Sequence, residues 1–369
     1  DDPFNRRLDA TTPIPFAWPE KIAGSHVAEG TLGNCAGGVT PWGTILTCEE
    51  NYPDTYPAPG KKGLYGWELH FQPPQEHYGW VVEVNPLTGA AKKLVALGCF
   101  FHECATFARA KNGRAVVYMG DDRTDQCVYK FISNTASSLE RGTLFVANLT
   151  TGRWMPLKRE ANPELKKRFT TETDLLIHAR EAGLMAGGTV LDRPEDVELD
   201  PATGAVIIAC TNNKAKGRPF GSLLRIEEAG GDAGAMEFES RTWVMGGTES
   251  GIACPDNLAF DRHGALWVTT DISGSSTGKP PYTEFGNNSL FYMPLQGTEA
   301  GRAIRVANAP VEAELTGPCF SPDGRTLAIS VQHPGEESQV GKERTSHWPR
   351  GGMNDPRPAV VMIEGDWLK

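Results

Sequence analysis

The sequence repeats one local pattern along most of its length: a short β-type run, a turn containing Pro or Asp followed by Gly, and a second β-type run. Proline and aspartate favour the turn, glycine accepts a positive φ, and β-branched residues favour both arms, so each copy predicts a β-hairpin. Three successive turns begin at Asp200, Asp261 and Ser321, a spacing of about 60 residues. Earlier copies have turns at 85–89 and 151–152.

An all-β unit that recurs every 40 to 60 residues or so is typical of a propeller blade. The turns indicate five or six blades, and we expect an all-β fold, a six-bladed β-propeller with loop insertions that forms a single domain over 1–369. An irregular β-sandwich is the alternative, but it gives no reason for a constant spacing. Apolar residues spaced among Glu and Lys at about 162–183 predict a short helical insertion.

Charge and hydropathy exclude several classes of partner. The formal net charge is −10 and no basic stretch of about five or more residues occurs, which argues against nucleic acid and against an anionic membrane surface. No apolar run reaches the roughly 18 residues that a membrane-spanning helix needs. We therefore expect a monomer whose partner is a small molecule. An acidic protein can bind an anion only where metal ions or arginines offset its carboxylates.

The eight cysteines are scattered and form no C-x-x-C pair, so a zinc knuckle is not indicated. Cys99 and Cys104 are close enough for a small disulfide loop, although spacing alone does not establish one. The chain begins at Asp1 without a signal peptide, as a mature or a truncated secreted protein would. The residues themselves therefore do not give the localisation.

One stretch combines a Gly-rich turn with a strand that ends in ionisable groups. The turn opens on Asn34, and the apolar run at 44–47 leads directly into Cys48, Glu49 and Glu50. Burying adjacent carboxylates without a cation is costly, so such a strand needs an arginine or a metal ion as partner. A solvated loop after the strand is the alternative reading of these residue types.

Similar polar clusters fall at the ends of other predicted strands, and in a propeller such loops meet at one mouth of the channel. Oxygen ligands from several loops suit Ca²⁺, a single thiolate favours a transition metal such as iron, and the Arg193 guanidinium matches phosphate oxygens. Pro194 biases Arg193 toward an extended backbone. The clusters are Cys48/Glu49/Glu50, His102/Glu103, Asp121/Asp122/Arg123, Arg193/Glu195/Asp196, Asp256/Asn257, Asp271 and Gln332/His333.

The stretch 34–51, N-C-A-G-G-V-T-P-W-G-T-I-L-T-C-E-E-N, resembles the signature of the PhoX-type alkaline phosphatases, secreted bacterial phosphomonoesterases. The resemblance continues in the same order to the C-terminal part of the chain. It covers G-C-F-F-H-E-C-A at 98–105, R-P-E-D at 193–196, P-D-N at 255–257, T-G-P at 316–318 and Q-H-P-G at 332–335. It implies a six-bladed propeller, hydrolysis of phosphate monoesters and export to the periplasm.

The resemblance also implies a mixed calcium and iron cluster at the channel mouth. By motif, Cys48 matches the iron-bound cysteine, and Arg193 and Asn34 match phosphate-binding residues, with Glu195 beside them in the catalytic set. The acidic metal ligands implied are Glu49, Glu103, Glu195, Asp196 and Asp256, with Asn257 and Asp271 as further candidates. Cys99 and Cys104 flank the His-Glu pair where the family pattern leads us to expect a basic or polar residue and a small one.

Two other functions compete with a metal-dependent phosphomonoesterase. A calcium-dependent propeller hydrolase of the lactonase or phosphotriesterase type needs one central Ca²⁺ and no thiolate, which leaves Cys48 and Arg193 without a role. A non-enzymatic propeller that binds a partner on one face predicts exposed aromatic patches instead of carboxylates around a channel. Serine-hydrolase, NTPase and zincin chemistry have no motif in the sequence.

Overall fold

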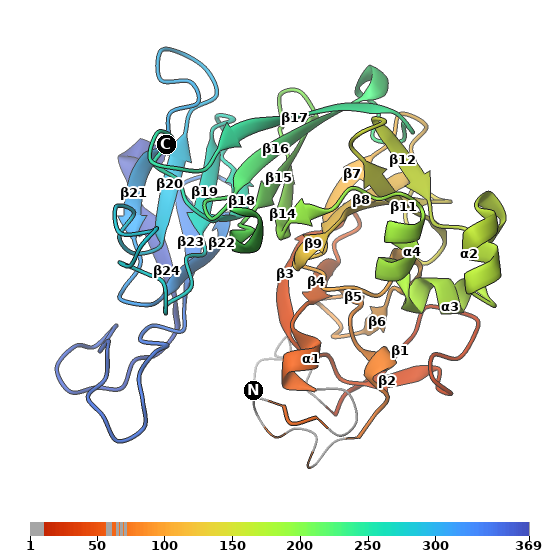
Figure 1. Cartoon of the computed structure of the whole chain (residues 1–369), viewed down its shortest axis with the longest axis horizontal. Helices are drawn as coiled ribbons and strands as arrows, with labels where there is room; N and C mark the ends of the chain where they lie inside the picture. Colours follow the sequence, from red (N-terminus) through yellow and green to blue (C-terminus); the bar gives the residue numbers. More distant parts are fainter. Residues whose placement is uncertain (1–10, 57–60, 64–65, 67–68, 70–71, 369) are drawn as a thin grey trace. The chain divides into compact units, whose positions relative to one another are not determined.

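The computed structural model describes residues 11–56, 61–63, 66, 69 and 72–368, and strands dominate it (Figure 1). The chain divides into two compact units. The first contains Asp1–Val197 and Glu227–Ser240, and the second contains Glu198–Ile226 and Arg241–Lys369. The prediction of a single domain over the whole chain stays a prediction.

The first unit begins with a two-stranded sheet and then forms a four-stranded antiparallel sheet whose strands follow one another in sequence. The turn at 85–89 shows why: the Asn85 side chain accepts hydrogen bonds from the N–H groups of Leu87 and Thr88, and Gly89 has a φ of 72°. The strands are β1 (Pro13–Pro15) and β2 (Val27–Glu29), then β3 (Asn34–Val39), β4 (Ile45–Glu49), β5 (Val81–Val84) and β6 (Ala91–Lys93).

The next sheet of the first unit has five strands in the order β12-β11-β10-β8-β7. Every residue of β8 and β10 is buried, because these central strands are covered on both faces. The strands are β7 (Thr106–Arg109), β8 (Ala115–Gly120), β10 (Val128–Ser133), β11 (Gly142–Asn148) and β12 (Arg153–Pro156), and a small pair is formed by β9 (Thr124–Gln126) and β13 (Leu191–Asp192).

Three short helices occupy the region where the sequence predicts a helical insertion, at the right-hand side of Figure 1. Asn162 and Thr171 cap the first two, each accepting a backbone N–H with its side-chain oxygen. The apolar positions of the insertion, among them Leu165 and Leu175, are buried in the core of the first unit. The helices are α2 (Pro163–Arg168), α3 (Glu172–Ile177) and α4 (Ala179–Met185), and a single-turn α1 (Tyr52–Thr55) follows β4.

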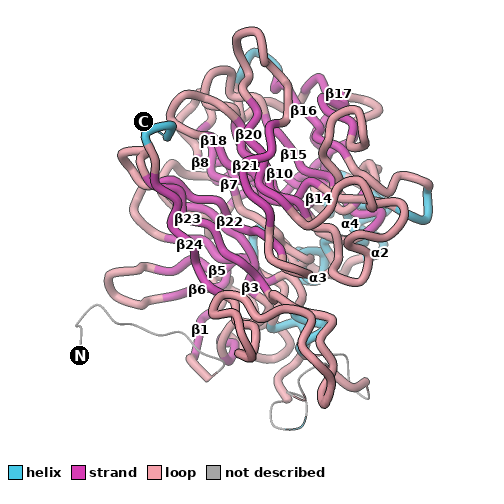
Figure 2. Tube along the Cα trace, turned by 90° about the vertical axis from the view of Figure 1, so that its left-hand side faces the viewer, coloured by secondary structure: helices cyan, strands magenta, loops and turns pink. Residues whose placement is uncertain are grey.

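Three further sheets follow along the chain, two of four strands and one of three. In Figure 2 the three strands of the last sheet run side by side. The strands are β14 (Pro194–Leu199), β15 (Val206–Cys210), β16 (Ser222–Glu228) and β17 (Phe238–Met245); β18 (Pro255–Phe260), β19 (Leu266–Thr270), β20 (Ser289–Met293) and β21 (Ile304–Asn308); and β22 (Glu314–Phe320), β23 (Thr326–Gln332) and β24 (Ala359–Glu364). Short 3-10 turns are η2 (Gln75–His77), η3 (Val95–Leu97), η4 (Arg159–Ala161), η5 (Lys214–Lys216), η6 (Ala229–Gly231) and η7 (Asp366–Leu368).

These sheets are the blades of a β-propeller, which confirms the predicted all-β class. The turns that begin at Asp200, Asp261 and Ser321 each join the first two strands of a blade, as the spacing predicts. The described residues form five blade sheets, so the expectation of six is wrong. Each of the five turns, including the one at 151–152 that joins β11 to β12, lies in a different blade sheet, so the turns alone match five blades and the sixth was implied by the family resemblance.

Two sequence expectations concern single features. None of the eight cysteines is in a disulfide in the described structure, and this includes Cys99 and Cys104. Among the described residues, no helix has both the length and the apolar character to cross a lipid bilayer.

Candidate active site

The polar end of the first blade carries the cluster that the sequence singles out. β3 and β4 pair antiparallel with Asn34 opposite Glu49, and the register shifts between Asn34 and Gly37. A bulge of this kind redirects side chains at the end of a strand pair. The chain leaves β4 through Glu50, whose carboxylate is buried but points away from that of Glu49 and has different partners.

Glu49 is fully buried and its carboxylate is saturated by structural donors. Oε1 accepts a hydrogen bond from Lys93 Nζ at 2.7 Å and from Leu32 N at 3.1 Å, while Oε2 accepts from Gly79 N at 3.0 Å and Trp80 N at 3.1 Å. The Lys93 side chain is also fully buried. This geometry does not fit the metal role predicted for Glu49, because the carboxylate already compensates a buried cation and three backbone N–H groups.

Cys48 belongs to the apolar core of the first unit together with Leu46, Trp80 and Val81. Burial, followed by the nearby charges of Glu103 and Asp196, raises the pKa of the Cys48 thiol well above its ordinary value. A thiol packed in this way behaves as a small apolar side chain and disfavours the thiolate form that a metal ligand needs. Its packing favours a structural role for Cys48, and the iron-ligand role that the sequence predicts for it stays a prediction.

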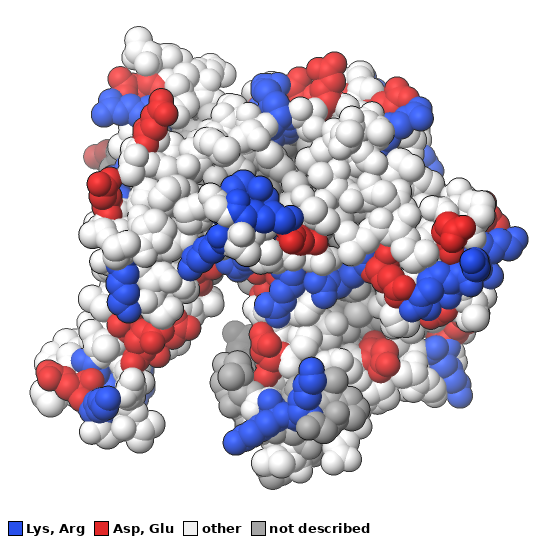
Figure 3. All heavy atoms as spheres, viewed as in Figure 1, with Lys and Arg blue, Asp and Glu red and all other residues white. Residues whose placement is uncertain are grey.

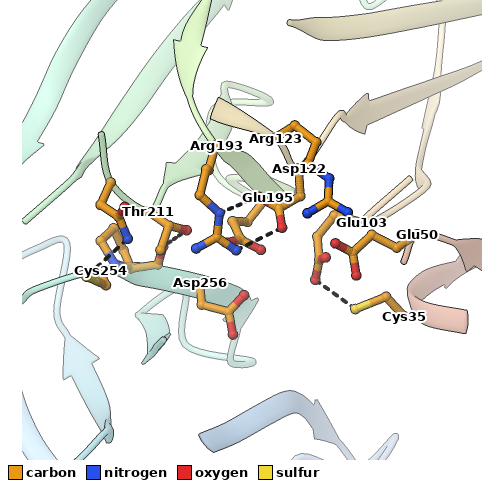
Figure 4. Close-up of polar contacts among 12 residues, drawn as sticks. Cys35, Glu50, Glu103, Asp122, Arg123, Arg193, Glu195, Thr211, Cys254 and Asp256 are labelled. Atoms are coloured by element: carbon orange, nitrogen blue, oxygen red, sulfur yellow. Dashed lines mark hydrogen bonds and ion pairs between the residues drawn. The ribbon is translucent and has the colours of Figure 1, made fainter. Parts of the chain in front are cut away.

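Cys35 is exposed near the start of β3, and it lies beside a candidate ligand carboxylate, which is the role that the sequence predicts for Cys48. Its thiol donates a hydrogen bond to Glu103 Oε1 at 3.0 Å. One ligand atom from each of Cys35, Glu50 and Glu103 lies within 4.8 Å of the others (Figure 4). We call these three residues the thiol–carboxylate group.

The electrostatics of the thiol–carboxylate group call for a cation. Burial and the neighbouring Asp122 carboxylate raise the pKa of Glu103 to about 8, and burial and Glu103 raise that of Glu50 well above its ordinary value. Glu50 Oε1 is buried and has no hydrogen-bond partner among the described residues. A sulfur and two carboxylates at this separation match the ligand set of a transition metal with oxophilic neighbours, so the residues present fit a metal.

Arg193 lies beside this group and forms ion pairs with two carboxylates. Its Nε donates to Asp122 Oδ1 at 2.9 Å, its Nη2 lies 2.8 Å from Asp122 Oδ2, and the same Nη2 lies 2.7 Å from Glu195 Oε1. Ligand oxygens of Glu103 and Glu195 lie within 4.8 Å of each other. The predicted residues Arg193, Glu195 and Glu103 are thus brought together, with Asp122 as a partner of Arg193 that the sequence analysis did not assign to it.

The backbone of Arg193 differs from its sequence expectation. Its φ is 58°, in the left-handed region, whereas the residue before a proline is expected to be extended. A non-glycine residue in this region costs of the order of 1 kcal/mol or more and persists only when its surroundings hold it. The forked ion pair with Asp122 and the bond to Glu195 supply that restraint.

His102 precedes Glu103 but faces the interior. Its Nε2 lies 2.9 Å from the Gly98 carbonyl oxygen, and its ring centroid lies 3.6 Å from that of Phe100. Burial lowers the pKa of His102 to about 3, so the imidazole is neutral at ordinary pH. His102 is therefore a structural residue that sets the position of Glu103.

The remaining predicted site residues are placed individually. Asn34 is exposed, and its amide nitrogen donates to Thr31 Oγ1 at 2.8 Å and Thr47 Oγ1 at 3.1 Å. Asp196 is buried, and its Oδ1 accepts the Val197 N–H at 2.8 Å. Asp256 lies buried on β18 of the second unit, where Asn257 Nδ2 donates to it at 3.1 Å. Their roles as phosphate contact and metal ligands stay predictions.

Sequence reasoning missed Cys35, and it named Glu50 and Asp122 only as members of polar clusters, without a role as metal ligand or as partner of Arg193. Cys48 follows an apolar run whereas Cys35 precedes a glycine pair, and a thiol in an apolar run is more often packed than reactive. That contrast is a signal for Cys35 in the sequence itself. No comparable signal in the sequence distinguishes Glu50 from Glu49. Which of the two joins the thiol–carboxylate group depends on the bulge and on Lys93 from a different strand.

Strand ends that together contribute a thiol, several carboxylates and an oriented arginine define a metalloenzyme site suited to an anionic substrate. Comparison of the sequence with models of protein families identifies the family. The model described as alkaline phosphatase PhoX matches residues 1–335, and the chain belongs to that family. It is a metal-dependent phosphatase that acts on a small-molecule phosphate.

Solved structures support the same assignment. The chain is similar to Pseudomonas fluorescens PhoX in complex with vanadate, a transition state analogue, with a TM-score of 0.84 and 29% identity, covering 99% of this chain and 76% of that one. A periplasmic gluconolactonase from Pseudomonas aeruginosa matches with a TM-score of only 0.39 and 12% identity, covering 83% of this chain and 66% of that one. The latter value is too low to support the lactonase alternative. A search of curated proteins returned no match.

Proposed function

We propose that this protein hydrolyses phosphate monoesters with calcium and iron as its metals. The observation that carries the proposal is the thiol–carboxylate group, because a buried Glu50 oxygen, which has no hydrogen-bond partner in the described part of the chain, lies near a thiol and a second carboxylate. A soft thiolate among hard carboxylates favours iron at one position and calcium at oxygen-only positions nearby. When bound, such ions neutralise phosphate oxygens and lower the pKa of an attacking oxygen.

Each proposed metal ligand has a defined role. Cys35, Glu50 and Glu103 hold the iron, with Cys35 as its thiolate ligand. Glu195, which lies near Glu103, serves as a further ligand and orients Arg193. The remaining proposed ligands, carried over from the family motif, are Asp196 and Asp256.

Arg193 and Asn34 are proposed to bind the phosphate. Asp122 and Glu195 hold the guanidinium of Arg193 in one plane before substrate arrives, so little reorganisation is needed when it binds phosphate oxygens. Asn34 lies on β3 of the first blade, where its amide nitrogen donates to Thr31 and Thr47, so we propose that it exchanges one of these hydrogen bonds for a phosphate oxygen. The similarity to the Pseudomonas fluorescens protein, which binds vanadate as a transition state analogue, supports a site of this kind.

We further propose that the protein is a bacterial periplasmic or secreted monomer. The support is the family match, together with the resemblance of its motifs to secreted phosphatases. Size-exclusion chromatography with light scattering tests the monomer, and fractionation of cells that express the full gene tests the export.

Substrate preference tests the proposed reaction directly. We expect the purified enzyme to hydrolyse p-nitrophenyl phosphate at least about 100-fold faster, as kcat/KM, than bis(p-nitrophenyl) phosphate, because a dianionic monoester gains more from metals and Arg193 than a monoanionic diester does. Gluconolactone serves as the substrate for the competing lactonase function. A preference for the diester or for the lactone would contradict the proposed function.

A further inference from the structure

Asn51 occupies the N-cap of α1, yet its side chain makes no capping hydrogen bond. Asparagine is favoured at this position because its side-chain oxygen normally accepts a backbone N–H of the first turn. Here the amide nitrogen is directed to the preceding residue instead, donating to Glu50 Oε2 at 2.5 Å. A residue that departs from its local role beside a candidate active site is a sign of function.

Arg123 fixes the orientation of the Asn51 amide. Its Nη2 donates to Asn51 Oδ1 at 3.1 Å. A guanidinium has only donors, so the amide oxygen must face Arg123 and the NH₂ group must face Glu50. The Asn51 side chain is therefore held at both ends, and the Glu50 carboxylate is held with it.

Arg123 is itself held from two further sides. Its guanidinium carbon lies 4.2 Å from the centre of the Phe101 ring, a cation–π distance, and its Nη2 lies 3.4 Å from Asp54 Oδ2. Asp54 is half exposed, so this ion pair is worth little energy, and the ring contact is the stronger restraint. Arg123 is labelled in Figure 4 next to Glu50.

The consequence falls on the two oxygens of Glu50. Oε2 is occupied by Asn51, whereas Oε1 is buried without a hydrogen-bond partner among the described residues. Figure 4 shows the ends of Glu50, Glu103 and Cys35 turned toward one another. Only one oxygen of Glu50 is thus presented to the thiol–carboxylate group.

We propose that Asn51 and Arg123 are positioning residues that lock Glu50 as a one-oxygen ligand of the metal shared with Cys35 and Glu103. This inference rests on the proposed metal role of the thiol–carboxylate group. Partners that orient a ligand in this way typically contribute about 10- to 100-fold to metal affinity. In this proposal Asn51 and Arg123 act through Glu50 and are not themselves ligands of the metal or contacts of the substrate.

The test follows metal loss from the intact metal-loaded enzyme. Wild type, Asn51→Leu, Arg123→Lys and Asp54→Asn are exposed to excess EDTA, desalted at intervals and analysed for calcium and iron, with p-nitrophenyl phosphate hydrolysis measured on the same samples. Leucine is close in size to asparagine but donates no hydrogen bond. We expect metal loss about 10- to 100-fold faster in Asn51→Leu and an intermediate effect in Arg123→Lys, which keeps the charge but loses the planar fork.

Asp54→Asn is the matched control, because it removes the negative charge that pairs with Arg123 and leaves the side chains of Asn51 and Glu50 unchanged. It should lose metal at the wild-type rate. Thermal melts of the metal-loaded proteins identify a variant that is merely unfolded, in which case Arg123→Gln, at a partly exposed position, replaces Asn51→Leu. Asn51 and Arg123 variants that are folded and release metal as slowly as wild type would overturn the inference.

Glu50→Gln separates this inference from the proposed function. If Glu50→Gln loses metal rapidly while the Asn51 and Arg123 variants do not, the positioning roles are overturned and the metal role of Glu50 stands. If Glu50→Gln itself retains metal and full activity, both are overturned, because there is then no ligand for Asn51 to position.

Discussion

At the scale of single residues, partners from elsewhere in the chain decide what each ionisable group does. Glu49 and Glu50 are neighbours in sequence, but one neutralises a buried lysine and the other joins a thiol and a carboxylate. The motif fixes where ionisable residues gather, and it correctly brings Arg193, Glu103 and Glu195 together in the first unit. It does not show which member of each cluster faces the core, because that depends on a bulge and on a lysine 44 residues away.

A pair of cysteine substitutions tests the exchange of roles between Cys35 and Cys48. We expect Cys35→Ser to lose iron and most activity while its melting temperature, measured without metal, matches that of metal-free wild type, because a hydroxyl replaces a thiolate poorly. Cys48→Ser should keep iron and activity but lose about 1–3 kcal/mol of unfolding free energy, since it buries a hydroxyl in an apolar core. The opposite pattern of metal contents would return the ligand role to Cys48.

Arg193→Lys tests the proposed phosphate-binding arginine. Lysine keeps the charge but loses the fork that grips Asp122, so we predict a fall in kcat/KM of about 10- to 1000-fold, or about 1.4 to 4 kcal/mol, with metal content unchanged. Steady-state kinetics on p-nitrophenyl phosphate, beside a thermal melt, separates catalysis from stability. A variant with wild-type kcat/KM and a lowered melting temperature would show that Arg193 only pairs with its carboxylates.

At the scale of elements, turn chemistry predicts one hairpin in each of the five blade sheets that the described residues form. The turns at Asp200, Asp261 and Ser321 carry their own conformational preferences, so the hairpins that they open could be foreseen. The place of the hairpin at 151–152 at the edge of its blade could not be foreseen, because it depends on which sheet β11 joins. The helices at 163–185 follow from their apolar spacing and from the caps Asn162 and Thr171.

One ion pair ties α4 to the edge of the site. Arg180 Nε lies 2.9 Å from Asp121 Oδ2, and Asp121 is fully buried while Arg180 is one-third exposed. Burial raises the pKa of Asp121 to about 7 even with Arg180 beside it. The packing of α4 therefore depends on the buried Asp121 carboxylate, whose charge is stabilised by Arg180.

Arg180→Gln should destabilise the protein by about 1–3 kcal/mol, because it leaves the Asp121 charge buried without its partner; the partial exposure of Arg180 keeps the expected loss below that of a fully buried pair. Adding Asp121→Asn should restore part of the loss, since the buried charge is then gone. Chemical denaturation of the single and double variants measures both effects. Additive losses in the double variant would show that the two residues do not stabilise α4 as a pair.

At the scale of the whole molecule, a chain with a formal net charge of −10 acts on an anion. On the face shown in Figure 3, Lys and Arg are interspersed with Asp and Glu among the described residues, so this surface provides no large basic patch to attract phosphate. We expect attraction to come from the site, from Arg193 and from ions that offset the carboxylates. Burial and neighbouring acids raise the pKa values of Glu50 and Glu103, as expected of carboxylates that a bound cation would stabilise.

Elemental analysis of the purified, active wild-type protein tests this account most directly. The account predicts calcium together with iron, retained through gel filtration, and a loss of phosphatase activity that follows their removal by a chelator. Active protein that contains only zinc and magnesium, or protein that keeps full activity after all metal has been removed, would contradict it.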